Sequence, residues 1–119
     1  MARVTGIGGI FFRAQNPGAL SDWYQRHLGI TQPDVAVWRQ AAGPTVFTPF
    51  AADSDYFPEG KQWMLNLRVD DLSALIVQLR AAGIAVETRA DWDGDGSHGR
   101  FARLHDPEGT PIELWQPPA

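Results

Sequence analysis

The hydrophobic and polar positions of the sequence predict a strand followed by a helix near the N-terminus. Residues 5–13 form an apolar, β-rich run, and Asn16 and Pro17 follow it as a capping residue and a proline suited to the first helical position. Apolar side chains then recur at helical spacing from Leu20 to Leu28, and Gly29 supplies the left-handed conformation that commonly ends a helix. The pattern predicts a helix over residues 17–28.

The same order of elements recurs in the second half of the chain. Residues 63–69 alternate between apolar and polar side chains, as a half-buried strand does, and Asp70 and Asp71 form the cap region of the next helix. That helix runs up to Gly83, and its apolar stripe consists of Leu72, Leu75, Ile76 and Leu79. The two halves are therefore interpreted as repeats of one strand–helix unit.

Short β segments follow each predicted helix. They are expected at residues 30–35, 37–41 and 45–50 in the first half and at residues 84–88, 99–105 and 111–116 in the second. Residues 106–109, Asp-Pro-Glu-Gly, predict a turn that pairs the last two segments as a hairpin. The result is an α+β fold with one domain over residues 1–119, built from two βαβββ modules at about 1–60 and 61–119. The unassigned stretches 51–62 and 89–98 are expected to form the rims of a pocket.

Alternation along two predicted strands places a set of polar side chains on one face of the sheet. The core-facing positions of these strands are apolar, so the residues between them point to the opposite face. That opposite face carries Met64, Asn66, Arg68, Glu113 and Trp115. The pattern fits a concave binding surface, and it fits equally a solvated sheet face or a dimer contact.

Composition removes several classes of function. The chain has no cysteine, which excludes disulfides, thiolate metal sites and thiol nucleophiles and fits a cytoplasmic location. A formal net charge of −4, with dispersed basic residues, disfavours nucleic acid as a partner. The apolar N-terminal stretch is short and broken by glycines, so neither a membrane span nor a cleaved signal is expected.

Five tryptophans are many for 119 residues. Of these, Trp38, Trp63, Trp92 and Trp115 are candidates for stacking on a ligand. The alternative is that they anchor the core or a dimer interface.

Three groups of residues together resemble the vicinal oxygen chelate superfamily. They are the first strand and helix ending in WYQRHLGI, the segment MLNLRVDDL at the start of the second half, and residues 106–109 followed by Ile112, Glu113 and Leu114. This superfamily contains glyoxalase I, extradiol dioxygenases, fosfomycin-resistance enzymes and bleomycin-binding proteins. The resemblance covers nearly the whole chain, and it implies a homodimer in which cupped mixed sheets surround a cavity.

The resemblance also allows a test for a metal site. Metal-dependent members place a ligand on the first and last strands of each module, and these positions correspond here to Gly9, Thr48 (or Phe47), Met64 and Glu113. Only Glu113 is a credible ligand, so no metal or other cofactor is expected. A site of His98, His105 and Glu113 is disfavoured because no spacing brings them together. The acidic run 91–96 resembles half of a calcium loop, but Ala102 stands at its twelfth position.

The favoured hypothesis is a metal-independent protein that binds a planar or aromatic small molecule. The residues expected to contact the ligand are Arg13, Trp38, Thr48, Met64, Asn66, Arg68, Trp92 and Trp115, with Glu113 orienting its polar groups. A second hypothesis is a lyase, isomerase or dioxygenase-like enzyme that uses Glu113 as acid or base beside Arg68, Asn66 or Arg13. A third is a protein-interaction module whose contact is the segment 47–57.

Overall fold

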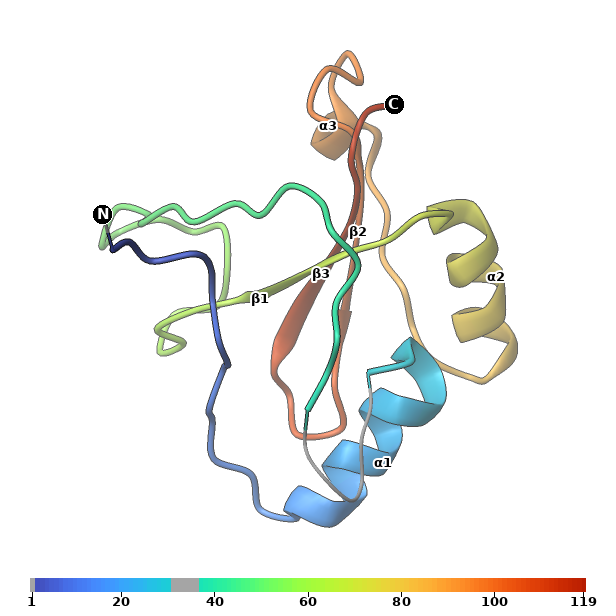
Figure 1. Cartoon of the computed structure of the whole chain (residues 1–119). Coiled ribbons are helices and arrows are strands. Elements are labelled where there is room, and N and C mark those ends of the chain that lie inside the picture. The colour runs from blue at the N-terminus through green and yellow to red at the C-terminus, as the bar shows by residue number, and fades with distance from the viewer. Residues whose placement is uncertain (1, 31–36) are drawn as a thin grey trace.

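Three helices and three strands make up the framework of the part of the chain that the structure describes. The computed structural model describes residues 2–30 and 37–119. In chain order the elements are α1 (Pro17–Leu28), β1 (Leu65–Arg68), α2 (Leu72–Ala81), α3 (Ala90–Asp93), β2 (Arg100–His105) and β3 (Pro111–Gln116). Figure 1 shows α1 and α2 on one side of the strands and the extended N-terminal segment on the other.

Both long helices begin and end where the sequence predicts. The side chain of Asn16 accepts a hydrogen bond from the backbone N–H of Ala19 at 3.2 Å, and Gly29 ends α1 with a φ of 69°. Asp71 caps α2 in the same way, through the backbone N–H of Ala74 at 3.1 Å. Among the described residues, no helix has the length and hydropathy needed to cross a membrane.

The sheet has the strand order β1-β3-β2, with β3 in the centre. β3 runs parallel to β1 and antiparallel to β2. The predicted hairpin between β2 and β3 is confirmed, and Asp106 Oδ1 closes its turn by accepting from the backbone N–H groups of Glu108 and Thr110 at 2.8 and 3.0 Å. The predicted strand at 84–88 is reduced to a single bridge between Glu87 and Arg103.

The core lies between the helices and one face of the sheet. Its buried apolar residues are Leu20, Tyr24, Leu67, Leu72, Ile76, Leu79, Val86, Ala102, Leu104, Ile112 and Leu114. In β1, β2 and β3 these residues occupy alternate positions, as the predicted alternation requires. The opposite face of the sheet is therefore left to polar side chains.

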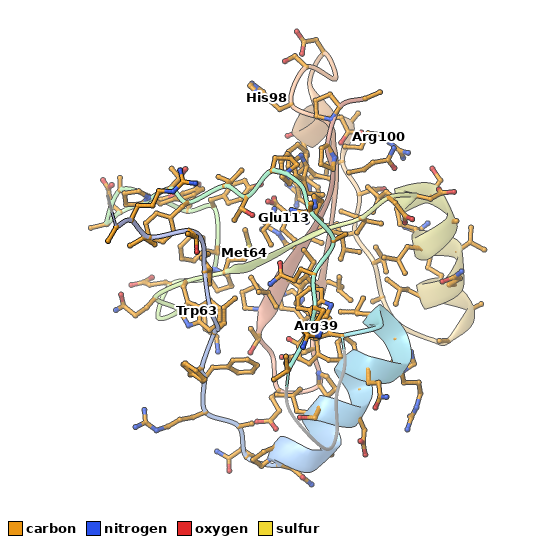
Figure 2. All side chains as sticks on the ribbon, viewed as in Figure 1. Arg39, Trp63, Met64, His98, Arg100 and Glu113 are labelled. Carbon is orange, nitrogen blue, oxygen red and sulfur yellow. The ribbon has the colours of Figure 1, made fainter. Side chains whose placement is uncertain are left out.

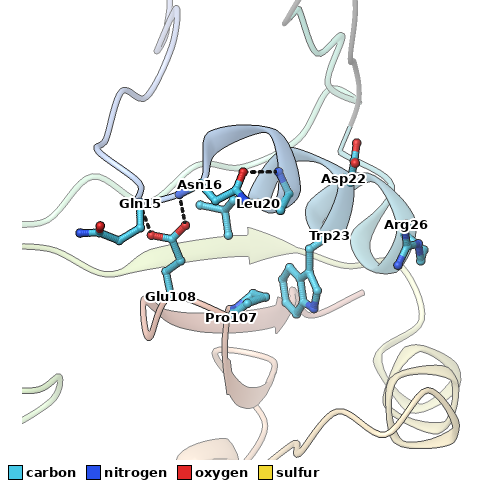
Figure 3. A pocket seen from close by; sticks show the side chains of 9 residues that line it. Gln15, Asn16, Leu20, Asp22, Trp23, Arg26, Pro107 and Glu108 are labelled. Carbon is cyan, nitrogen blue, oxygen red and sulfur yellow. Dashed lines mark hydrogen bonds between the residues drawn. The ribbon is translucent and has the colours of Figure 1, made fainter.

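The turn between β2 and β3 attaches α1 to the second half of the chain. The Tyr24 hydroxyl donates a buried hydrogen bond of 2.7 Å to Asp106 Oδ2. The two carboxylate oxygens of Glu108 accept from the backbone N–H groups of Gln15 and Asn16 at 2.6 and 3.0 Å, as Figure 3 shows. A carboxylate at the start of a helix is favourable because the first N–H groups lack partners within the helix.

The strands predicted in the first half are absent from the chain taken alone. Within the described residues, 5–13, 37–41 and 45–50 form no β-ladder, and the prediction at 30–35 falls almost wholly outside those residues. A strand requires a neighbouring backbone that pairs with it in register. The described residues therefore form an open three-stranded sheet, and the pair of βαβββ modules stays a prediction.

The two extended segments, residues 2–14 and 37–50, expose large apolar side chains. Phe11 is 95% exposed and Phe47 is 86% exposed. All the exposed large apolar residues except Trp63 and Val77 lie in these two segments. The radius of gyration of 15.1 Å exceeds the value of about 13.5 Å for a compact domain of this length. The molecule is therefore open on the side of the sheet opposite the helices.

Gly99, just before β2, is expected to tolerate no side chain. Its φ is 101°, and a Cβ there would overlap the backbone oxygen of Gln116 and lie 2.9 Å from Trp115 Nε1. Gly99→Ala should lower the free energy of unfolding by more than about 3 kcal/mol, because left-handed strain and a backbone clash add together. Urea unfolding measures this loss.

Gly83→Ala is the matched control. Gly83 has a φ of 83°, but a Cβ there would have open space. Its cost should be about 1 kcal/mol, from strain alone. Equal losses for the two variants would contradict the close approach of the Gly99 backbone to β3.

Candidate functional site

Glu113 is the centre of the polar face of the sheet. It lies on the central strand β3 and is only 7% exposed, although it points away from the apolar core. Its Oε2 accepts a hydrogen bond from the Tyr56 hydroxyl, and its Oε1 accepts one of 2.7 Å from Asn66 Nδ2. Both carboxylate oxygens therefore have a donor. Figure 2 shows Glu113 at the middle of the sheet.

Arg103 lies directly across from Glu113 on β2. Its guanidinium carbon is 4.7 Å from the centre of the Tyr56 ring and 5.2 Å from the centre of the Trp92 ring. Such contacts stabilise a cation through the negative faces of the rings. The Arg103 Nε is buried and has no hydrogen-bond partner among the described residues.

Tyr56 joins these two charged residues. It comes from the stretch 51–62, where the Ser54 hydroxyl oxygen accepts a hydrogen bond of 3.2 Å from the Tyr56 backbone N–H. The centres of the Tyr56 and Phe50 rings lie 5.3 Å apart. Burial, followed by the hydrogen bond to Glu113 and its negative charge, raises the pKa of Tyr56 to about 12. Arg103 opposes this rise in pKa because its positive charge favours the phenolate.

Arg68 connects the two halves of the chain, and its predicted contact with a ligand stays a prediction. Its Nη1 and Nη2 donate to the backbone oxygens of Pro44 and Ala41 at 2.5 and 2.6 Å. At Gly43, a Cβ would lie 2.8 Å from the Arg68 Nε, so a side chain there would require the guanidinium to shift. Arg68 thus holds residues 41–44 of the first half against the sheet of the second half.

The other predicted ligand-contacting residues are not gathered at Glu113. Trp115 shares its face, but the indole N–H donates to the backbone oxygen of His98 at 2.7 Å. Met64 is half-buried at the start of β1. The remaining three occupy the exposed extended segments and make no hydrogen bond or ring contact with the cluster in the described chain: Arg13, Trp38 and Thr48. Their contact with a ligand stays a prediction.

The residues at the expected metal positions do not fit a divalent cation. Gly9 has no side-chain donor, and both oxygens of Glu113 already accept hydrogen bonds. Over residues 2–30 and 37–119, no three His, Asp or Glu side chains converge. In the calcium-like stretch, the carboxylates of Asp93 and Asp95 accept from the backbone N–H groups of Phe101 and Ser97, both at 2.9 Å.

Sequence reasoning missed two members of the cluster. Arg103 had a signal, since Ala102 and Leu104 are apolar and face the core, which places Arg103 on the same face as Glu113. Tyr56 had none, because its stretch shows no periodicity and its partner lies 57 residues away along the chain.

A groove of about 630 Å³ beside α1 lies apart from this cluster. Figure 3 shows its lining, which includes Trp23, Arg26, Pro107 and Glu108. Glu108 is already engaged by the backbone of α1, so this groove results from the docking of the helix on the turn. The cluster around Glu113 is the better candidate because it combines charge, aromatic rings and an unpaired donor.

Comparisons with known proteins agree with the resemblance seen in the sequence. The family model for the glyoxalase-like domain matches residues 9–115. Among solved structures, the chain is similar to TnmS3, an antibiotic binding protein from Streptomyces sp. CB03234, with a TM-score of 0.61 and 24% identity. That match covers 99% of this chain and 100% of TnmS3, and it shows a shared fold. A search of curated proteins gives no significant match.

Both tyrosines should stay protonated in the folded protein well above the ordinary tyrosine pKa of 10.0. Burial and a carboxylate partner raise the pKa of Tyr56 to about 12 and raise that of Tyr24 even further. Phenolate absorbance should therefore be absent from the folded protein at a pH where both tyrosines of the denatured chain have ionised.

The sign of the stability effect follows from these directions. The contribution of the neutral tyrosines to folding is complete below 10.0, the pKa of an unperturbed tyrosine, and for Tyr56 it is lost as the pH rises toward about 12. Tyr56→Phe should reduce this alkaline loss of stability. Phenolate absorbance that appears near the ordinary value in the native protein would contradict the hydrogen bonds to Glu113 and Asp106.

Proposed function

The chain belongs to the glyoxalase-like domain family, and we propose on that basis that it binds a small molecule on the polar face of its sheet. The observation that carries the proposal is the cluster of Glu113, Tyr56, Arg103 and Trp92. It places a buried carboxylate and a guanidinium beside two aromatic rings. Flat aromatic surfaces with a few fixed polar groups are typical of sites for small ligands.

The proposed ligand is planar, and its binding needs no metal. The rings of Trp92 and Tyr56 offer stacking surface, and a stacking contact requires no cation to orient it. Of the four positions that hold metal in related enzymes, only position 113 has a side chain suited to bind one. The carboxylate oxygens of Glu113 accept hydrogen bonds from Tyr56 and Asn66. The similarity of fold to an antibiotic binding protein supports binding in preference to catalysis.

We further propose that the site is completed in a homodimer of two-module chains. The segments 2–14 and 37–50 have the apolar content of strands but form no β-ladder among the described residues. β1 is an edge strand there, paired only with β3, so its outer edge is available for another strand. A second copy offers the same segments and the same edge, so a symmetric pair would bury both.

Ligand binding can be tested by a titration followed through tryptophan fluorescence. We expect planar aromatic compounds from a broad panel to change the fluorescence, and EDTA to leave their Kd unchanged. Trp92→Ala should weaken the binding of these compounds by about tenfold, through the loss of a stacking surface. Trp23→Ala, in the groove beside α1, should leave the Kd unchanged. Unaltered fluorescence across the whole panel would refute the proposal.

Self-association can be tested by light scattering during size-exclusion chromatography. The wild-type chain should elute as a dimer. Phe47→Asp should yield a monomer, because it places a charge within the apolar surface that a partner would cover. Val77→Asp is the control, since Val77 is 69% exposed but lies on α2, away from the open side. A monomeric wild type, or equal effects of the two variants, would exclude this interface.

A further inference from the structure

Glu113 and Arg103 carry opposite charges and face each other across β3 and β2 but do not form an ion pair. Directly opposed side chains of an antiparallel pair lie close enough to interact. The salt bridge found among the described residues instead joins Arg89 and Glu87. Glu113 is satisfied by Tyr56 and Asn66, which leaves Arg103 without a carboxylate.

The group that lacks a hydrogen-bond partner at this site is a donor, the Nε–H of Arg103. The rings of Tyr56 and Trp92 interact with the flat guanidinium of Arg103, and the Tyr56 hydroxyl oxygen accepts a side-chain hydrogen bond from it, but neither residue pairs with its Nε. The buried Nε of Arg103 consequently has no partner among the described residues. An unpaired buried donor is costly, and an incoming acceptor would remove that cost.

Tyr56 is placed so that a ligand can reach Arg103. It belongs to a stretch outside every helix and strand, so its ring can shift without breaking a β-ladder. Its displacement would give up the hydrogen bond to Glu113 and uncover part of the guanidinium, while the Trp92 ring stays beside Arg103. A guanidinium matches a carboxylate in shape and can donate two parallel hydrogen bonds to it.

We infer that Arg103 is the specificity-determining residue of the proposed binding site and that it selects an aromatic carboxylate. The inference rests on the proposed function and names its ligand class. The carboxylate accepts from the Arg103 guanidinium, and the attached ring stacks against Trp92.

Naphthoate and naphthamide form a matched pair of probes, equal in ring and size but different in charge. Calorimetric titration of the wild-type protein should give a Kd for naphthoate at least about tenfold lower than that for naphthamide. In nitrogen-edited NMR spectra, the Nε–H resonance of Arg103 should move with naphthoate and stay in place with naphthamide. Both measurements use the unaltered chain.

Two variants assign the preference to a single guanidinium. Arg103→Gln should bring the ratio of the two Kd values to about one, whatever its effect on the Kd of naphthamide. Arg100→Gln is the control for charge, since Arg100 lies on the same strand but donates to the Ser73 hydroxyl oxygen at 2.8 Å. It should keep the full preference for naphthoate.

The outcomes separate this inference from the proposed function. Equal Kd values for the two probes, or a preference for naphthoate that survives Arg103→Gln, would overturn the role of Arg103. Either result would leave the proposed binding function standing. Failure of naphthoate to bind, while other compounds of the fluorescence panel do, would also overturn it and leave the binding function standing. Failure of every compound would remove both proposals.

Discussion

The alternation of side chains along β3 is the constraint on which the rest of the structure depends. β3 is the central strand, so both of its edges are paired and its side chains must divide between two faces. Ile112 and Leu114 are fully buried under the helices, and the residue between them, Glu113, is forced to the opposite face. The position of the carboxylate thus follows from the packing of the core.

A buried carboxylate imposes requirements on its surroundings. Removing Glu113 from water is costly unless donors replace the water, and Tyr56 and Asn66 are those donors. Asn66 is supplied by the register of β1, whereas Tyr56 must arrive from a stretch without regular structure. The same arrangement leaves Arg103 beside the rings of Tyr56 and Trp92. Its Nε–H has no hydrogen-bond partner among the described residues. This face therefore presents a cation whose Nε–H has no acceptor among the described residues.

Besides the contact of Tyr56 with Glu113, polar contacts attach the first half of the chain to the second at two further places among the described residues. Tyr24 and the start of α1 are held by Asp106 and Glu108 of the turn. On the other side of the sheet, Arg68 holds the backbone of residues 41–44. These contacts fix α1 in the core but give the extended segments no β partner among the described residues. A homodimer is the proposed solution, because hydrophobic strands without pairing are unfavourable in water.

The sequence by itself determined the features that depend on neighbours a few residues apart. Caps at Asn16 and Asp71, the helical spacing of apolar residues, the turn at 106–109 and the alternation in β1 and β3 act locally, so α1, α2 and the polar face were predictable. Tertiary structure alone decided that Tyr56 meets Glu113 across 57 residues and that Arg68 donates to the backbone oxygens of Pro44 and Ala41. It also decided that the apolar segments 5–13 and 38–50, though suited to be strands, form no β-ladder within the described chain. The physical reason is that helices satisfy their own hydrogen bonds, whereas strands and buried charges depend on partners that only the folded chain brings near.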